Sequence, residues 1–172
     1  MTGLERNADV VHMATYAPLF AHVEGWQWRP DLIWFNNLES FRTVSWHVQQ
    51  LFGQYRGENT LRVTMDGNNV TGAEGQDGLF SSAVRDGGKV YVKVVNTSDA
   101  PRNITISLRG LKKKEIYKAV KEIRLSSDEL YKDNSIEEPA LFEPEEILFK
   151  GEGQNFNAEL PAYCFSIFVL EK

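Results

Sequence analysis

The hydrophobic pattern of this chain changes its period once, and that change limits the folds available to it. Up to about Tyr55 the apolar residues recur at helical spacing around one short apolar run, whereas after about Thr60 they alternate along short segments. Alternation with a period of two is typical of strands with one buried face. The sequence therefore predicts a mainly β protein, with a jelly-roll-like β-sandwich over residues 58–172 preceded by a helix, strand and helix over residues 1–57.

The first part is predicted to open with a helix followed by a buried strand. Apolar residues over 4–16 form a narrow helical stripe, and Pro18 ends this helix because proline has no backbone N–H to donate. The stripe begins almost at the first residue, which we interpret as the mark of a chain cut from a longer protein. Residues 31–35 are nearly all apolar and end in two asparagines, as in a parallel strand covered on both faces.

A second helix is predicted from an N-cap at Thr43 to about Tyr55, with Gly57 as its stop. The apolar residues that recur at helical spacing are Val44, Val48, Leu51, Phe52 and Tyr55. A helix, a buried strand and another helix make one slice of a larger α/β structure.

The second part is predicted to form short strands separated by turn clusters such as Asp86-Gly87-Gly88. Over residues 89–95, valines alternate with side chains such as Lys93, so one face of that strand is expected to be buried. No helical pattern interrupts these segments, which favours a sandwich or jelly roll. The predicted strands cover residues 60–65, 79–84, 89–95, 103–108, 115–125, 146–149, 155–160 and 163–170.

Composition argues against several kinds of partner. With a formal net charge of -5, the chain lacks the basic surface that a phosphate backbone attracts. No nucleic-acid partner is therefore expected. No stretch approaches the ~20 apolar residues of a membrane span, and no targeting segment precedes the first helix. Cys164 is the only cysteine and lies in an apolar run, so we expect a buried hydrophobic side chain rather than a reactive thiol.

No metal or cofactor is expected. The histidines at positions 12, 22 and 47 lack the spacing and the nearby cysteines of a metal site. The acidic residues over 137–146 lack a glycine-turned calcium loop, so we expect a solvated loop stiffened by prolines. The basic cluster at residues 112–114 is expected to be a solvated turn.

Several blocks of this sequence match a known family. The first block runs from Leu4 to Leu19, with Asn7 to Leu19 as its most specific part, and is followed by Trp28 to Asn36 and Ser45 to Phe52. The β part adds Val90 to Asn96 and Leu160 to Ser166. Together these blocks resemble the C-terminal part of the α-L-arabinofuranosidases of glycoside hydrolase family 51. By this resemblance, the second and third blocks are similar to the last strand and the last helix of a catalytic (β/α)8 (TIM) barrel.

The resemblance implies a parent enzyme that removes terminal α-L-arabinofuranosyl groups from plant arabinoxylan or arabinan with retention of configuration. Retention requires two carboxyl groups roughly 5 Å apart. In the family both are glutamates on barrel strands that precede the matched region, and the acid/base glutamate directly follows an asparagine. Because this chain has no Asn-Glu dipeptide and one expected barrel strand, we predict that it is inactive alone. Its expected partner is the missing N-terminal catalytic barrel, in a parent enzyme that is extracellular or periplasmic rather than cytoplasmic.

Four residues are candidates for sugar contact in the intact enzyme. Asn36 and Asn37 follow the buried strand, where TIM barrels place functional side chains, or else they cap the next turn. Trp26 and Trp28 are suited to form the wall of a sugar subsite, or else they pack on the sandwich. Trp34, in the middle of the strand, is expected to be core. The family's sugar-contacting glutamine near this strand has no clear match in this chain.

The chain is thus expected to be a non-catalytic ancillary domain that stabilises or orients a glycosidase. The alternative is an autonomous carbohydrate-binding module. All four tryptophans lie in the first part, away from the strands that would form the binding face of a module. Saturable binding of arabinan or arabinoxylan oligosaccharides by residues 58–172 alone would favour the module. A purely structural or adhesion sandwich would leave the barrel-like first part unexplained.

Overall fold

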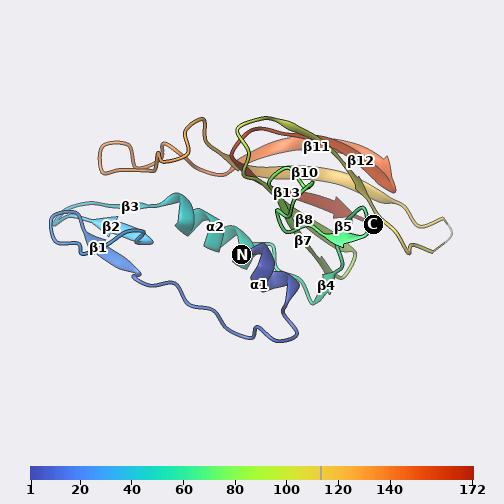
Figure 1. Ribbon diagram of the computed structural model, residues 1–172, viewed down its shortest axis with the longest axis horizontal. Coiled ribbons are helices and arrows are strands. Elements are labelled where there is room, and N and C mark those ends of the chain that lie inside the picture. Colours follow the sequence, from blue (N-terminus) through green and yellow to red (C-terminus); the bar gives the residue numbers. More distant parts are fainter. Residues whose placement is uncertain (113) are drawn as a thin grey trace.

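The computed structural model describes residues 1–112 and 114–172, and the middle residue of the predicted basic turn, Lys113, lies outside them. A small sheet lies at one end of an elongated molecule and a sandwich at the other (Figure 1). The helices are α1 (Thr2–Arg6) and α2 (Val44–Gln54). The strands are β1 (Phe20–His22), β2 (Ile33–Phe35), β3 (Ser40–Arg42), β4 (Asn59–Leu61), β5 (Thr64–Met65), β6 (Asn68–Asn69), β7 (Leu79–Asp86), β8 (Lys89–Asn96), β9 (Arg102–Ser107), β10 (Tyr117–Ser126), β11 (Glu145–Gly153), β12 (Asn155–Leu160) and β13 (Cys164–Glu171).

The sandwich is built on a six-stranded antiparallel sheet in the order β11-β10-β13-β8-β7-β4. Its central strand, β13, is the last in the sequence and is buried on both faces. Phe168 and Leu170 face one core, while Phe165 and Ile167 face another. This two-sided burial explains why the strand is a continuous apolar run rather than an alternating one.

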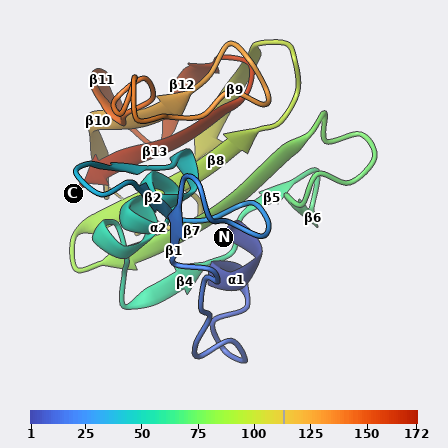
Figure 2. The same cartoon turned by 90° about the vertical axis from the view of Figure 1, so that its left-hand side faces the viewer.

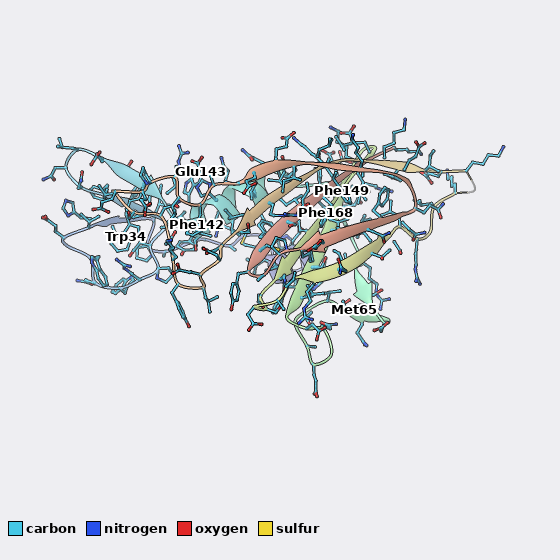
Figure 3. All side chains as sticks on the ribbon, turned by 90° about the horizontal axis from the view of Figure 1, so that it is seen from above. Trp34, Met65, Phe142, Glu143, Phe149 and Phe168 are labelled. Carbon is cyan, nitrogen blue, oxygen red and sulfur yellow. The ribbon has the colours of Figure 1, made fainter. Side chains whose placement is uncertain are left out.

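The smaller layer of the sandwich is the antiparallel pair β9 and β12. Phe156 and Leu160 of β12 pack with Phe168 in the larger core, and Phe149 of β11 packs against the same cluster. Figure 3 shows Phe149 and Phe168 side by side between the strands. The mainly β sandwich predicted from the alternating pattern is confirmed.

Helix α2 covers the opposite face of the six-stranded sheet, on the side that also carries α1 (Figure 2). The predicted N-cap is confirmed, because Thr43 Oγ1 accepts a hydrogen bond from Trp46 N at 3.3 Å. Gly57 has a different role from the predicted helix stop. A Cβ at that position would lie 2.6 Å from the Arg85 carbonyl oxygen, so the glycine permits a close approach to β7.

The predicted first helix is wrong in its length. Helix α1 ends at Arg6, whereas the apolar stripe predicted a helix over residues 4–16. The Asn7 side chain donates to the Gly3 carbonyl at 2.7 Å and so ends the helix. The residues beyond it have little to pack against, since Val10 is 70% and Met13 84% exposed. A short helix without a packed face is not stable in water.

The small sheet has the order β1-β2-β3. Strand β2 is parallel to β1, as predicted from the apolar run. It is shorter than predicted, and on its other side it pairs antiparallel with β3. Strand β1 was not predicted. Trp34 is core, as expected, and packs with Ala21 and Phe41. The division of the chain at residues 57 and 58 and the barrel origin of the first part stay predictions.

Cys164 is 3% exposed and belongs to the larger core. Burial raises the pKa of its thiol, with a smaller opposing effect of the Ser166 hydroxyl. The prediction that Cys164 is buried is therefore confirmed, and the raised pKa disfavours the reactive thiolate form.

Candidate functional site

The four predicted sugar-contacting residues belong to the segments that follow β1 and β2, the parallel strands of the small sheet (Figure 1). Strands β1 and β2 are parallel and in register over all three of their residues, so the segments that follow them leave the sheet at the same edge. Trp26 and Trp28 belong to the segment after β1. Asn36 and Asn37 belong to the turn after β2. Asn36 and Asn37 thus follow a parallel strand, as the TIM-barrel argument expects, and contact of any of the four residues with a sugar stays a prediction.

An arginine that the sequence analysis did not single out organises the aromatic residues at this edge. The Arg29 guanidinium carbon lies 5.0 Å from the ring centre of Trp26 and 4.8 Å from that of Trp34. The two indole rings meet edge to face at 5.8 Å. Trp26 thus packs on the small sheet and not on the sandwich. Trp28 is 57% exposed, so its ring is free for contact.

Asn36 shapes the turn between β2 and β3. Its Oδ1 accepts hydrogen bonds from the backbone N–H groups of Leu38, at 2.8 Å, and Glu39, at 2.7 Å. This is the turn-capping role that sequence analysis named as the alternative. Asn37 is exposed beside it. Contact of either asparagine with a sugar stays a prediction.

A loop of the sandwich, residues 127–144, is hydrogen-bonded to the end of β3 and the start of α2. Asn134 donates to the Arg42 carbonyl at 2.8 Å and accepts from Phe142 N at 2.7 Å. The adjacent Asp133 accepts from Val44 N, 89 residues away in sequence, at 2.8 Å. Asp and Asn commonly cap turns and helices. The local sequence does not reveal that the partners of Asp133 and Asn134 are Val44 and Arg42, so neither residue was predicted as part of a site.

His47 is buried where α2 meets this loop. Its side chain is 3% exposed, Trp46 contacts its ring at 5.2 Å, and neither ring nitrogen has a hydrogen-bond partner among the described residues. Burial lowers the pKa of His47 below its usual 6.5, and the Glu143 carboxylate opposes this shift in part. Figure 3 shows Glu143 at this end, close to Phe142. The neutral imidazole is therefore the form that the fold favours.

This burial predicts a pH dependence of stability. The unfolded chain binds a proton on His47 near pH 6.5, while the folded chain binds it only at lower pH. The contribution is therefore complete above pH 6.5 and is lost as the pH falls through the lowered folded pKa. We expect the free energy of unfolding, measured in urea, to fall more steeply between pH 7 and pH 5 than it does in His47→Leu. His12→Leu, at an exposed position, is the control. Equal pH slopes in the three proteins would contradict this assignment.

The acidic residues of the small sheet do not have the setting of a catalytic pair. Glu24 follows β1 and Glu39 precedes β3, and both are exposed. Neither lies in the apolar pocket that tunes a catalytic acid. Asp31 precedes β2, at the other end of that strand from Asn36, and is 2% exposed.

The part of the chain that the structure describes contains neither a cluster of metal ligands nor a membrane-spanning helix. Within residues 1–112 and 114–172, no three His, Cys, Asp or Glu side chains are grouped as metal ligands. Neither of the helices found there is long and apolar enough to cross a membrane. An open depression lies over β9 and β12, lined by Asn103, Thr105, Asn157 and Glu159 among others. It is formed by the sandwich and is separate from the four candidate residues.

The fold is that of the β-rich C-terminal domains that follow glycosidase catalytic domains. Residues 1–164 match the family model described as the α-L-arabinofuranosidase C-terminal domain, so the chain belongs to that family. It is 32% identical to α-L-arabinofuranosidase 1 of Arabidopsis thaliana over 100% of this chain and 25% of that protein. Over 36% of its length it is 54% identical to an extracellular exo-α-L-arabinofuranosidase of Streptomyces chartreusis.

Solved structures agree with the family. An arabinose-bound GH51 α-L-arabinofuranosidase superposes with a TM-score of 0.83 and 27% identity over 99% of this chain and 26% of that one. The GH51 arabinofuranosidase of Xanthomonas axonopodis pv. citri has the same fold, with a TM-score of 0.73 and 18% identity over 99% of this chain and 33% of that one. The chain thus spans a quarter to a third of the length of these relatives.

Proposed function

We propose that this chain is the non-catalytic C-terminal part of a retaining α-L-arabinofuranosidase, and that residues 1–57 complete the barrel of a catalytic region. The small sheet is the surface on which that region docks. The substrate of the parent enzyme is an arabinose-containing oligosaccharide or polysaccharide. The single observation that carries the proposal is that exposed apolar side chains and an open parallel strand occur together in the small sheet.

The first support is the open edge of β1. This strand pairs with β2 on one side, and in the sheet that the structure describes it is the outer strand. Parallel strands occur almost only in larger sheets whose faces are covered by helices. A three-residue parallel pair at a sheet edge is therefore the arrangement expected of a barrel from which the neighbouring strands are absent.

The second support is the apolar surface of the same end. Phe20 is 58%, Leu19 48% and Leu38 93% exposed, and Trp26 and Trp28 are also partly exposed. Single exposed apolar residues are ordinary, but a group of them marks a surface for a partner. A neighbouring protein region of complementary apolar character would remove this surface from water.

The third support comes from buried polar atoms without hydrogen-bond partners. Among the described residues these atoms are Tyr16 Oη, Asp31 Oδ2 and both ring nitrogens of His47. All of them lie between residues 16 and 47. Buried polar atoms are rarely left without a partner, because each costs about 1–3 kcal/mol. These atoms all belong to the segment that, in this proposal, completes the barrel.

The chain alone is expected to release no measurable 4-nitrophenol from 4-nitrophenyl α-L-arabinofuranoside, because the two carboxyl groups of the retaining mechanism lie on the catalytic region. The polypeptide in which a catalytic region precedes residue 1 is expected to hydrolyse the same substrate. Both proteins are assayed at equal concentration, with folding of the chain alone verified by circular dichroism.

The matched control is the longer polypeptide with its strand-end glutamates replaced by glutamine. Activity in the longer protein that these substitutions abolish would support the proposal. Turnover by the pure, folded chain alone would contradict it, and so would a longer polypeptide that is folded and has no arabinofuranosidase activity.

A further inference from the structure

Lys93 is a fully buried cation in the middle of the six-stranded sheet. Its side chain is 0% exposed. Its neighbours along β8, Val92 and Val94, point into the core shared with β9 and β12, so Lys93 points to the opposite face, under the two helices. A charged ammonium group in such a place is costly unless it is paired and hydrogen-bonded.

Three elements meet at the Lys93 ammonium. It forms an ion pair with Glu5 of α1. It donates to the carbonyl of Tyr55, the C-cap residue of α2, at 2.7 Å. The ring centre of Phe52, also in α2, lies 4.9 Å away. Lys93 thus connects strand β8 to both helices that cover the sheet.

The Glu5 carboxylate is held from its other side as well. Its Oε2 accepts a hydrogen bond from Ser82 of β7 at 2.6 Å. Next to it, Arg6 donates to the Ser81 carbonyl at 2.9 Å. Helix α1 has five residues, too few to be stable on their own. These polar contacts to β7 and β8 therefore fix its position.

Glu5 is the counter-charge of Lys93 among the groups that surround it. Helix α2 contributes a ring and a carbonyl, β7 contributes the Ser82 hydroxyl, and β13 presents Ile167 opposite Lys93. Burial lowers the pKa of Lys93, and the hydrogen bond and charge of Glu5 oppose that shift. Without Glu5, the folded sheet would enclose a cation with no anion.

We propose that the Glu5–Lys93 pair is an electrostatic clamp that makes residues 1–6 an obligatory part of the sandwich, although they are separated from it in sequence by the small sheet. The clamp sets the position of the segment by which the chain enters the domain. It also makes the stability of the sheet conditional on the docking of that segment. This inference concerns contacts within the chain, so it stands or falls separately from the proposed enzyme.

The test is a double-mutant cycle on the 172-residue chain, with thermal unfolding as the readout. Glu5→Gln alone is expected to lower the Tm by roughly 10 °C, because it leaves a buried, unpaired ammonium. Lys93→Met removes the charge and leaves an apolar side chain of similar length. The double variant Glu5→Gln with Lys93→Met is expected to recover at least half of the loss.

The same strand supplies a matched control. Lys89 and Glu171 form an ion pair at 2.9 Å in which both side chains are exposed, by 52% and 39%. Lys89→Met with Glu171→Gln is expected to change the Tm by about 2 °C or less. Hydrogen exchange of residues 2–6 should be faster in Glu5→Gln than in this control, because α1 leaves the sheet.

Deletion of residues 1–6 extends the test. The deletion is expected to be tolerated in the Lys93→Met background and to unfold the wild-type background. Additive losses in the double variant, or a double variant that does not fold, would overturn the clamp. So would a Glu5→Gln protein as stable as the Lys89 control.

Discussion

Phe168→Ala is expected to lower the free energy of unfolding by about 4 kcal/mol. Phe168 is 0% exposed at the centre of the sheet, and its ring centre lies 5.0 Å from that of Phe149. The substitution leaves a cavity between the two layers of the sandwich. Because β13 is hydrogen-bonded on both sides, its backbone is not free to move in and fill that space.

Urea unfolding followed by circular dichroism measures this loss. Leu148→Ala is the matched control, because Leu148 lies next to Phe149 on β11 and is 70% exposed. The control is expected to cost less than about 0.5 kcal/mol. A Phe168→Ala protein with the stability of the control would mean that the two layers are not packed as described.

Leu51→Ala is expected to lower the free energy of unfolding by about 3 kcal/mol. Leu51 is 3% exposed and packs with Phe165 and Ile167 beneath α2. The stacking of Phe52 on Phe165, at a ring-centre distance of 5.3 Å, remains in the variant and limits the loss. The helix is predicted from sequence and capped by Thr43, but its stability in the fold comes from this contact with the sheet.

The measurement combines urea unfolding with hydrogen exchange along α2. Gln54→Ala, at the exposed end of the same helix, is the control and should have a small effect. Faster exchange confined to residues 44–54 would indicate that the helix detaches locally. A Leu51→Ala protein that matches Gln54→Ala in both measurements would contradict the packing of α2 on the sandwich.

Most of the fold could be predicted because its signals are local. The cap at Thr43, the turn at residues 86–88 and the apolar run of β13 each act within a few residues. Strand β1 could not be predicted, since it has three residues and exists through pairing with β2. The length of α1 was overestimated because the stripe that predicted it has little to pack on in this chain.

Lys93 shows the limit of pattern arguments most clearly. In a strand of alternating valines, a lysine predicts a solvent-facing side. In the structure, helices α1 and α2 cover that side. The counter-charge of Lys93 is Glu5, 88 residues earlier in the sequence, so no pattern within the strand reveals it. For the candidate site, the sequence places Asn36 and Asn37 directly after β2, whereas the packing of Arg29 on Trp34 and the hydrogen bond of Asn134 to Arg42 depend on the tertiary fold.

The position of β13 has a consequence for synthesis on the ribosome. This strand separates the β10–β11 hairpin from β8, β7 and β4, and it follows all of them in the sequence, at residues 164–171. The nascent chain therefore has two half-sheets with unpaired edges until residues 164–171 leave the exit tunnel. A stop codon before residue 164 would leave both edges open in the released product, which would then be prone to aggregate rather than to fold into a shorter domain.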